Sequence, residues 1–254
     1  MPSATIGALG DIHGDVDSVR RIMRRHADVP LWICVGDVAD AEGRYEPFPA
    51  PLYWIKGNNE NFDAIASGDL PPGLHYIPNA VLTEIARPAL RIAGLGGTLA
   101  PTWYDTAASG LPYPTHRHAQ GRSDRSRGTK KGTAGATEAA GPPPRSGSSR
   151  AKSRDDKRRH FVREEVEACR AMRDVDIFLS HEAPRPFRVG RMDAGKTPIN
   201  EVLAAMQPRL HLFGHHHEFT DSVRQNVRSI GLDVVTKSYL LIDAETFKTE
   251  RLDT

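Results

Sequence analysis

Residues that can bind metal ions recur along this chain, each time directly after a short apolar run. The runs, from 5–9 to 210–213, are apolar enough to form buried strands, so each polar cluster lies where a strand ends. The ligands are therefore predicted to converge at one rim of a sheet. The five clusters are Asp11-Ile12-His13, Gly36-Asp37, Gly57-Asn58-Asn59-Glu60, Ser180-His181 and Gly214-His215-His216-His217.

The donor atoms in these clusters indicate which ions they suit. Carboxylates, imidazoles and an amide oxygen favour Mn, Fe, Zn, Ni or Mg over a site built from thiolates. The spacing suits two adjacent divalent metals, because an aspartate between two cations can bridge them. Each residue also has a purely structural interpretation: Asp11 as a helix cap, Asp37 as part of a turn, and His181 as a satisfied polar residue. Their joint order favours metal binding.

In this order the clusters resemble the motifs of the calcineurin-like metallophosphoesterases, which are D-x-H, G-D, G-N-H-(D/E), a lone His and G-H-x-H. Four of the five motifs match, and the resemblance covers nearly all of the chain outside one basic segment. It implies two mixed β-sheets packed as a sandwich and flanked by helices. The alternation of strands and helices by itself predicts only an α/β fold.

The resemblance also implies a ligand set and a reaction. Asp37 would bridge two ions, expected to be Mn²⁺, with Fe, Zn, Ni or Mg as other candidates. A hydroxide between the metals would attack phosphorus in line, without a covalent intermediate. The implied ligands of one metal are Asp11, His13, Asp37 and His217, and those of the other are Asp37, Asn58, His181 and His215.

Asn59 departs from the family pattern. The family usually has a histidine here, which protonates the leaving oxygen or stabilises the transition state, and an amide cannot act as an acid at neutral pH. We therefore expect a preference for activated esters, with Asn59 and Asp37 as candidate catalytic residues. Glu60 keeps the acidic position of the motif, and we expect it to orient Asn59 or a metal ligand.

His216 is the third candidate catalytic residue. Alternate residues that leave a strand face the same side, so His215 and His217 are expected to face the metals while His216 points away. His216 could then orient substrate or donate a proton. The alternative is an exposed residue with no role in the reaction.

Arg185 and Arg188 are candidate substrate-binding residues, because they could contact phosphate beside the metals. A solvated basic loop is the alternative. The segment 180–186 also has a local similarity to RNA lariat debranching enzymes, in which Ser-His is followed by an acidic residue and a proline.

A phosphodiesterase acting on a phosphate ester, with nucleotides or RNA as candidate substrates, is the function predicted from these residues. A protein Ser/Thr-type phosphomonoesterase is one alternative, although such enzymes rely on the histidine that Asn59 replaces. The other alternative is a binding module with a weakened site, such as the metallophosphoesterase-like retromer subunit.

One segment, 116–154, interrupts the predicted single domain of residues 1–254. It carries ten Lys and Arg against two Asp and Glu, a net of +8, which leaves −6 for the rest of the chain from the total of +2. Such a composition predicts a disordered loop. The insert either contacts nucleic acid through its charge or is a passive linker.

Periodicity and turn signals give the remaining elements. No run approaches the ~20 apolar residues that span a membrane, no secretion signal is apparent, and two isolated cysteines favour a cytoplasmic protein. The runs 74–77, 80–86 and 90–95 are predicted to be antiparallel strands of a second sheet. Other strands are predicted at 5–9, 31–35, 52–56, 175–180, 210–213, 227–230 and 239–242, and helices at 15–25, 61–66, 155–173 and 197–206.

Overall fold

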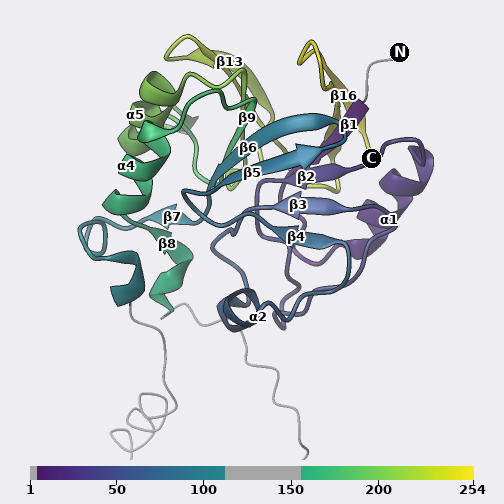
Figure 1. Cartoon of the computed structure of the whole chain (residues 1–254), viewed down its shortest axis with the longest axis horizontal. Helices are drawn as coiled ribbons and strands as arrows, with labels where there is room; N and C mark the ends of the chain where they lie inside the picture. The colour runs from purple at the N-terminus through teal and green to yellow at the C-terminus, as the bar shows by residue number, and fades with distance from the viewer. Residues whose placement is uncertain (1–4, 112–155) are drawn as a thin grey trace, which may run out of the picture.

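Two six-stranded sheets form the middle of the molecule, and the computed structural model describes residues 5–111 and 156–254 (Figure 1). The first sheet has the order β16-β15-β1-β2-β3-β4. Strands β1 to β4 run parallel, β15 runs antiparallel to β1, and β16 runs antiparallel to β15. The strands span Thr5–Leu9 (β1), Trp32–Cys34 (β2), Leu52–Trp54 (β3), Leu74–Tyr76 (β4), Ser238–Asp243 (β15) and Thr249–Asp253 (β16).

The second sheet has the order β13-β14-β12-β9-β6-β5. Its central strands β14, β12, β9 and β6 run parallel, and an antiparallel strand closes each edge. The carboxyl ends of the parallel strands therefore share one edge in each sheet. The strands span Leu82–Ala86 (β5), Ala89–Leu95 (β6), Ile177–Ser180 (β9), Leu210–Phe213 (β12), Thr220–Arg224 (β13) and Val227–Gly231 (β14).

The main core lies between the two sheets. Side chains on a strand alternate between its faces, so Ile33 and Val35 join this inner core while Trp32 and Cys34 face outward. The second sheet alternates in the same way, with Leu212 in the inner core and Phe178 outside it. Both faces of each sheet are thus apolar and need a covering layer.

Helices supply the outer layers. Helix α1 (Val16–Arg25) packs on the first sheet and is capped by Asp15, whose carboxylate accepts the Ser18 N–H at 3.2 Å. Helices α4 (Arg163–Ala171) and α5 (Thr197–Met206) pack on the second sheet, and α2 (Phe62–Ser67) follows β3. The result is the helix-flanked sandwich that the family resemblance predicts. No helix in the described residues is long and apolar enough to cross a membrane.

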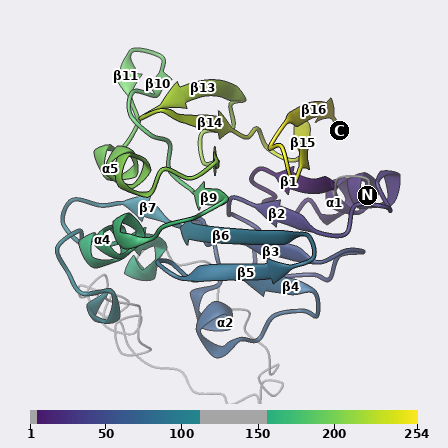
Figure 2. The same cartoon turned by 45° about the horizontal axis from the view of Figure 1, so that its top comes forward.

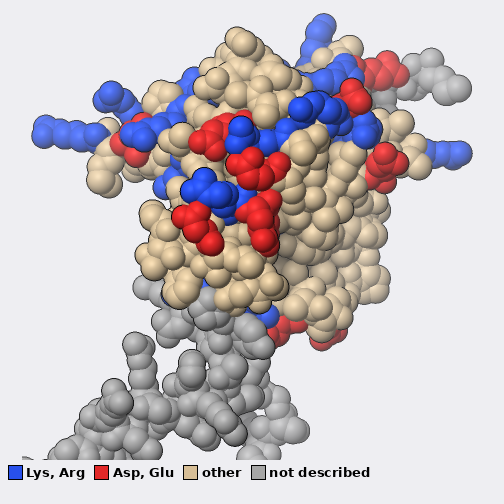
Figure 3. All heavy atoms as spheres, turned by 60° about the vertical axis from the view of Figure 1, so that its left-hand side comes forward, with Lys and Arg blue, Asp and Glu red and all other residues tan. Residues whose placement is uncertain are grey.

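Charged side chains cover the α4 and α5 side of the molecule. Figure 3 shows Lys and Arg interspersed there with Asp and Glu. On α4, Arg170 pairs with Glu167 at 2.7 Å, and Arg163 pairs with Asp105 at 2.5 Å. Such mixed charge is typical of a solvated helix face.

The strand predicted at 74–77 does not join the second sheet. It becomes β4, which pairs parallel with β3 in the first sheet and places Leu74 opposite Leu52. Helix α2 lies between β3 and β4 in the chain, and a crossover of this kind returns the chain parallel rather than antiparallel. The prediction for 80–86 and 90–95 is confirmed, because β5 and β6 pair antiparallel.

The helix predicted at 155–173 begins later than expected. A 3₁₀ turn at Lys157–Arg159 (η2) and a short strand at His160–Phe161 (β8) precede α4. Strand β8 pairs with β7 (Thr98–Leu99), so contacts with a distant segment override the local helical pattern. The remaining short elements are η1 (Ala108–Gly110) and the hairpin of β10 (Arg188–Val189) and β11 (Met192–Asp193). The basic insert 116–154 lies outside the described residues.

Candidate metal centre

Five strand ends bring the predicted ligands together. Asp11, Asp37 and Asn58 follow β1, β2 and β3 of the first sheet, which run parallel. His181 and the three histidines 215–217 follow β9 and β12 of the second sheet. Hydrogen bonds and close contacts connect residues from the two sheets, as the strand-end pattern predicts.

The first group contains Asp11, His13 and His217, which can each offer a ligand atom within 4.8 Å of the others. His217 Nε2 lies 3.0 Å from Asp11 Oδ2 and 3.2 Å from His13 Nε2. Burial opposes ionisation of Asp11, but the hydrogen bond with His217 and nearby charge hold the pKa of the carboxyl below its usual value. The same hydrogen bond raises the pKa of His217. Two imidazole nitrogens and a buried carboxylate facing one point are a donor set that fits a divalent cation.

The second group contains Asp11, Asp37 and His181, again within 4.8 Å of one another. His181 Nδ1 donates to the Val35 carbonyl at 2.8 Å, which leaves Nε2 facing Asn58 Oδ1 at 3.1 Å and Asp37 Oδ2 at 3.8 Å. A backbone carbonyl behind the ring fixes its orientation, as is usual for histidines that bind metals. Asp11 belongs to both groups, and Asp37 of the second group also lies 3.7 Å from His13 Nε2 of the first.

His215 lies beside the second group. Its ring centroid is 4.9 Å from that of His181, and its backbone N–H lies 3.2 Å from both oxygens of Asp11. Burial lowers the pKa of His215 to about 3, so the ring is neutral and can offer a lone pair. His13, Asp37, His215 and His217 all have positive φ, between 49° and 71°. Backbone strain of this kind is concentrated at functional sites.

Two glycines allow the ligand loops to approach this closely. A Cβ at Gly57 would overlap Asp37 Oδ1, and one at Gly214 would overlap Asp11 Oδ1. Any side chain at either position would displace a carboxylate of the candidate metal centre.

Asn59 contacts the Asp37 carboxylate. Its backbone N–H and its side-chain Nδ2 each donate to Asp37, to Oδ1 and Oδ2, both at 2.7 Å. The amide can thus orient a carboxylate and offer a hydrogen bond, but it has no proton to transfer.

Glu60 links the two loops that carry Asp37 and Asn58. Its buried carboxylate accepts the N–H groups of Val38 and Ala39 at 3.0 and 3.3 Å and that of Gly57 at 3.2 Å. Tyr45 donates its hydroxyl to Glu60 at 2.9 Å. Burial, with the neighbouring charge of Asp37, raises the pKa of Glu60 to about 7. Glu60 therefore positions the loops that carry the ligands.

His216 turns toward a different set of residues. Its ring stacks on Phe187 with centroids 4.7 Å apart, and its Nε2 lies 3.9 Å from Glu182 Oε2. Glu182 is buried and accepts the Leu99 N–H at 3.1 Å, with Lys196 Nζ 3.6 Å from its other oxygen. Glu182 and Phe187 are site neighbours that sequence reasoning missed, and the Ser-His-Glu spacing was the one signal for Glu182.

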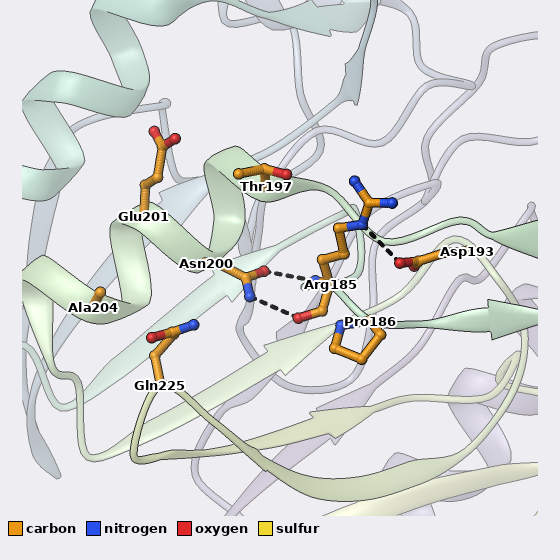
Figure 4. Close-up of a pocket in the computed structure, with 8 residues that line it drawn as sticks. All are labelled: Arg185, Pro186, Asp193, Thr197, Asn200, Glu201, Ala204 and Gln225. Atoms are coloured by element: carbon orange, nitrogen blue, oxygen red, sulfur yellow. Dashed lines mark hydrogen bonds and ion pairs between the residues drawn. The ribbon is translucent and has the colours of Figure 1, made fainter.

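The two candidate phosphate-binding arginines lie on the segment after His181. Arg185 lines a pocket beside α5, where its Nε donates to Asp193 at 2.7 Å (Figure 4). Asn200 holds the Arg185 backbone, accepting its N–H and donating to its carbonyl, both at 2.6 Å. Arg188 is exposed on β10. Contact of either arginine with substrate stays a prediction.

A family model for calcineurin-like phosphoesterases matches residues 4–219, most of the chain. The chain belongs to this family. As a calcineurin-like phosphoesterase it is a hydrolase of phosphate esters, and its candidate ligands suit the divalent metals that the family uses.

Solved structures share the fold of this phosphoesterase, while no curated protein sequence matches it. TT1561 of Thermus thermophilus is 13% identical, with a TM-score of 0.60 and coverage of 99% of both chains. The calcineurin-like phosphoesterase YfkN from Bacillus subtilis is 11% identical, with a TM-score of 0.48 over 99% of this chain and 91% of its own. The phosphopantetheinyl hydrolase PptH of Mycobacterium tuberculosis is 15% identical, with a TM-score of 0.44 over 92% and 90%. The local similarity to RNA lariat debranching enzymes stays a prediction.

Proposed function

We propose that this phosphoesterase is a phosphodiesterase that uses two divalent metal ions, with Mn²⁺ as the expected ion and Fe, Zn, Ni or Mg as alternatives. The main support is the position of Asp37, whose carboxylate lies 3.7 Å from His13 Nε2 on one side and 3.8 Å from His181 Nε2 on the other. A carboxylate that lies near a histidine of each group could bridge two ions, as a two-metal site requires.

Seven side chains would hold the ions. When bound, the two metals supply positive charge that activates water and neutralises the non-bridging oxygens of the phosphate. The chain itself positions Asp37 through Asn59 and fixes the Asp37 and Asn58 loops through Glu60. The proposed ligands are Asp11, His13, Asp37, Asn58, His181, His215 and His217.

An ester with a good leaving group suits this site better than an alkyl ester. Asn59 can donate a hydrogen bond to an oxygen but cannot protonate it. Loss of a general acid costs about 10²–10⁴-fold when the leaving group is poor, and less when it is good. Protein Ser/Thr phosphatases rely on the histidine that is absent here, which makes that alternative less consistent with the chain.

The test compares two esters of the same leaving group. Protein stripped of metal and reloaded with Mn²⁺ is expected to hydrolyse bis-p-nitrophenyl phosphate with a higher kcat/KM than p-nitrophenyl phosphate, and Asp37→Ala is expected to abolish both activities. Faster monoester hydrolysis would favour the phosphomonoesterase. Mn²⁺ binding without hydrolysis of either ester would favour a binding module.

We also infer a cytoplasmic location. Cys34 and Cys169 are both buried and unpaired. Proteins of oxidising compartments more often pair their cysteines.

A further inference from the structure

A hairpin with an exposed apolar face lies next to the candidate metal centre. In the 188–193 hairpin, Val189 pairs directly with Met192, and Figure 2 shows the hairpin projecting beside β13. Residues opposite each other in an antiparallel pair lie on the same face. Val189 is 44% exposed and Met192 is 72% exposed, and they are two of the four exposed large hydrophobic residues in the described part of the chain.

Two arginines of the same hairpin are available to bind anions. Arg188 lies on β10 and Arg191 in the turn, both are exposed, and neither has an ion pair among the described residues. Asp193 lies opposite Arg188 in the hairpin. Its carboxylate instead accepts hydrogen bonds from Arg185 Nε at 2.7 Å and from the Phe187 N–H at 2.9 Å. Guanidinium groups without a carboxylate partner are suited to phosphate.

The base of the hairpin contacts a residue next to the proposed ligands. Phe187, the residue before β10, stacks on His216, which lies between the proposed ligands His215 and His217. Strands rise about 3.3 Å per residue, so the tip of the hairpin lies within about 10 Å of Phe187 along the chain. At about 3.4 Å per stacked nucleotide, this reach corresponds to a few nucleotides.

One hydrogen bond joins the base of the hairpin to the second sheet. Arg224 on β13 donates to the Pro186 carbonyl at 3.2 Å. Within the hairpin, the Ala194 N–H continues the ladder by donating to the Phe187 carbonyl at 2.7 Å. The base of the hairpin is therefore held by Arg224 of the second sheet and by the stacking of Phe187 on His216. A surface held in this way loses little conformational entropy on binding.

The size and chemistry of this surface favour a nucleic acid. Two apolar side chains can bury far less surface than the ~800 Å² that each partner buries in a stable protein interface. A thioether contacts aromatic rings favourably, and an unpaired nucleobase offers an exposed ring for such a contact. Arg191 lies in the turn, and Arg188, which is in register with Asp193, lies on the face opposite Val189 and Met192. The two guanidinium groups therefore flank the apolar pair, where they can contact phosphates on either side of a bound base.

We propose that the 188–193 hairpin binds a single-stranded oligonucleotide whose scissile phosphodiester lies at the metal centre. Val189 and Met192 contact a base, and Arg188 and Arg191 contact phosphates next to the scissile one. This inference rests on the proposed function, because it names the substrate class of the same site.

A binding measurement on metal-free protein tests the hairpin separately from catalysis. The anisotropy of a fluorescein-labelled single-stranded 12-mer gives Kd over a series of salt concentrations. Arg188→Ser with Arg191→Ser is expected to raise Kd about tenfold and to reduce the salt slope by about 1.4, since each phosphate contact contributes about 0.7. Met192→Ser is expected to raise Kd several-fold, because it removes the contact of the thioether with a base. Arg24→Ser and Val81→Ser, at exposed positions elsewhere, are the matched controls.

A second measurement uses the Mn²⁺-loaded enzyme. The ratio of kcat/KM for the oligonucleotide to kcat/KM for bis-p-nitrophenyl phosphate is expected to fall several-fold in Met192→Ser, mainly through KM. The control variants are expected to keep the wild-type ratio. Absence of hydrolysis of bis-p-nitrophenyl phosphate would refute the proposed function, and the binding measurement would still decide the role of the hairpin.

Three results would overturn the inference. Hairpin variants that bind the 12-mer as tightly as the wild type would show that another part of the chain binds it. Hydrolysis of bis-p-nitrophenyl phosphate without binding of the 12-mer would exclude an oligonucleotide while leaving the phosphodiesterase in place. Binding to anionic lipid vesicles that depends on Met192, with no binding of the 12-mer, would assign the hairpin to a membrane surface.

Discussion

Asn59 binds Asp37 with two hydrogen bonds at a position where the family usually has a histidine. These hydrogen bonds orient a carboxylate of the candidate metal centre, but the amide cannot release a proton. At the scale of single residues, the site thus combines a full set of candidate metal ligands with the loss of one acid. The leaving group must then depart with little help from a proton donor.

Restoring the imidazole tests this interpretation. Asn59→His is expected to raise kcat for diesters with poor leaving groups by about a hundredfold and to change hydrolysis of bis-p-nitrophenyl phosphate much less. The measurement is kcat across aryl methyl phosphodiesters that differ in leaving-group pKa, with Asn59→Gln as an amide control. A uniform change across the series would argue against a missing acid at this position.

The residue types of the metal centre could be predicted from the sequence, but the partners behind them could not. Strand-end motifs pointed to the seven proposed ligands, and the structure brings all seven to adjoining strand ends. The sequence predicts that Glu60 orients Asn59 or a metal ligand, but not that its carboxylate reaches the ligand loops through the backbone N–H groups of Val38, Ala39 and Gly57. Every residue except proline has a backbone N–H, so the sequence does not show which of them bind a carboxylate. Contacts of this kind can be seen only in the structure.

At the scale of elements, strand β12 shows how a sheet face can bury a polar residue. His211 is fully buried on the outer face of the second sheet, where its ring nitrogens lie 2.8 Å from Ser180 Oγ and 3.1 Å from Ser229 Oγ. The ring also stacks on Phe178, with centroids 5.2 Å apart. Burial lowers the pKa of His211 to about 3, so the folded protein keeps this ring neutral.

This histidine is expected to make stability depend on pH. Because its pKa of about 3 in the folded state is below the ordinary histidine value of 6.5, the unfolded chain takes up the proton first as pH falls. Its contribution is fully present above about pH 6.5 and is lost at roughly 1.4 kcal/mol per pH unit below that. The free energy of unfolding in urea between pH 7 and 5 is expected to fall less steeply in His211→Asn than in the wild type. Equal slopes for the two proteins would contradict this account.

Helices and strands with a clear repeat of apolar residues could be predicted from the sequence. Elements that are very short, or that depend on a partner strand far along the chain, could not. The strands β1, β9 and β12 and the helices α1 and α5 follow apolar patterns that are visible in the sequence. Strands β7, β8, β10 and β11 have two residues each, too few to show a period, and they exist because a partner strand supplies their hydrogen bonds. The same limit explains β4, whose three residues do not indicate which sheet they join.

At the scale of the whole molecule, Lys56 links two parts of the chain that are about a hundred residues apart. It follows β3, is buried, and donates its Nζ to the carbonyls of Arg158 at 2.8 Å and His160 at 3.1 Å. Burial lowers the pKa of Lys56. The segment that follows the basic insert is thus fastened to the strand end that carries Asn58.

Removing this link is expected to destabilise the fold. Lys56→Met keeps most of the side-chain length but leaves both carbonyls without their donor, at a cost of about 2 kcal/mol in the free energy of unfolding. Urea unfolding of the metal-free protein measures this cost. Lys248→Met, at an exposed lysine, serves as the control. A cost no larger than that of the control would show that Lys56 does not hold the two segments together.

The number of Mn²⁺ ions bound per chain tests the two-metal centre most directly. Isothermal titration calorimetry of the metal-free protein is expected to give two Mn²⁺ ions for the wild type, and fewer than two for Asp37→Ala because the shared carboxylate is lost. One ion or none in the wild type, or two ions in Asp37→Ala, would contradict a dinuclear centre bridged by Asp37.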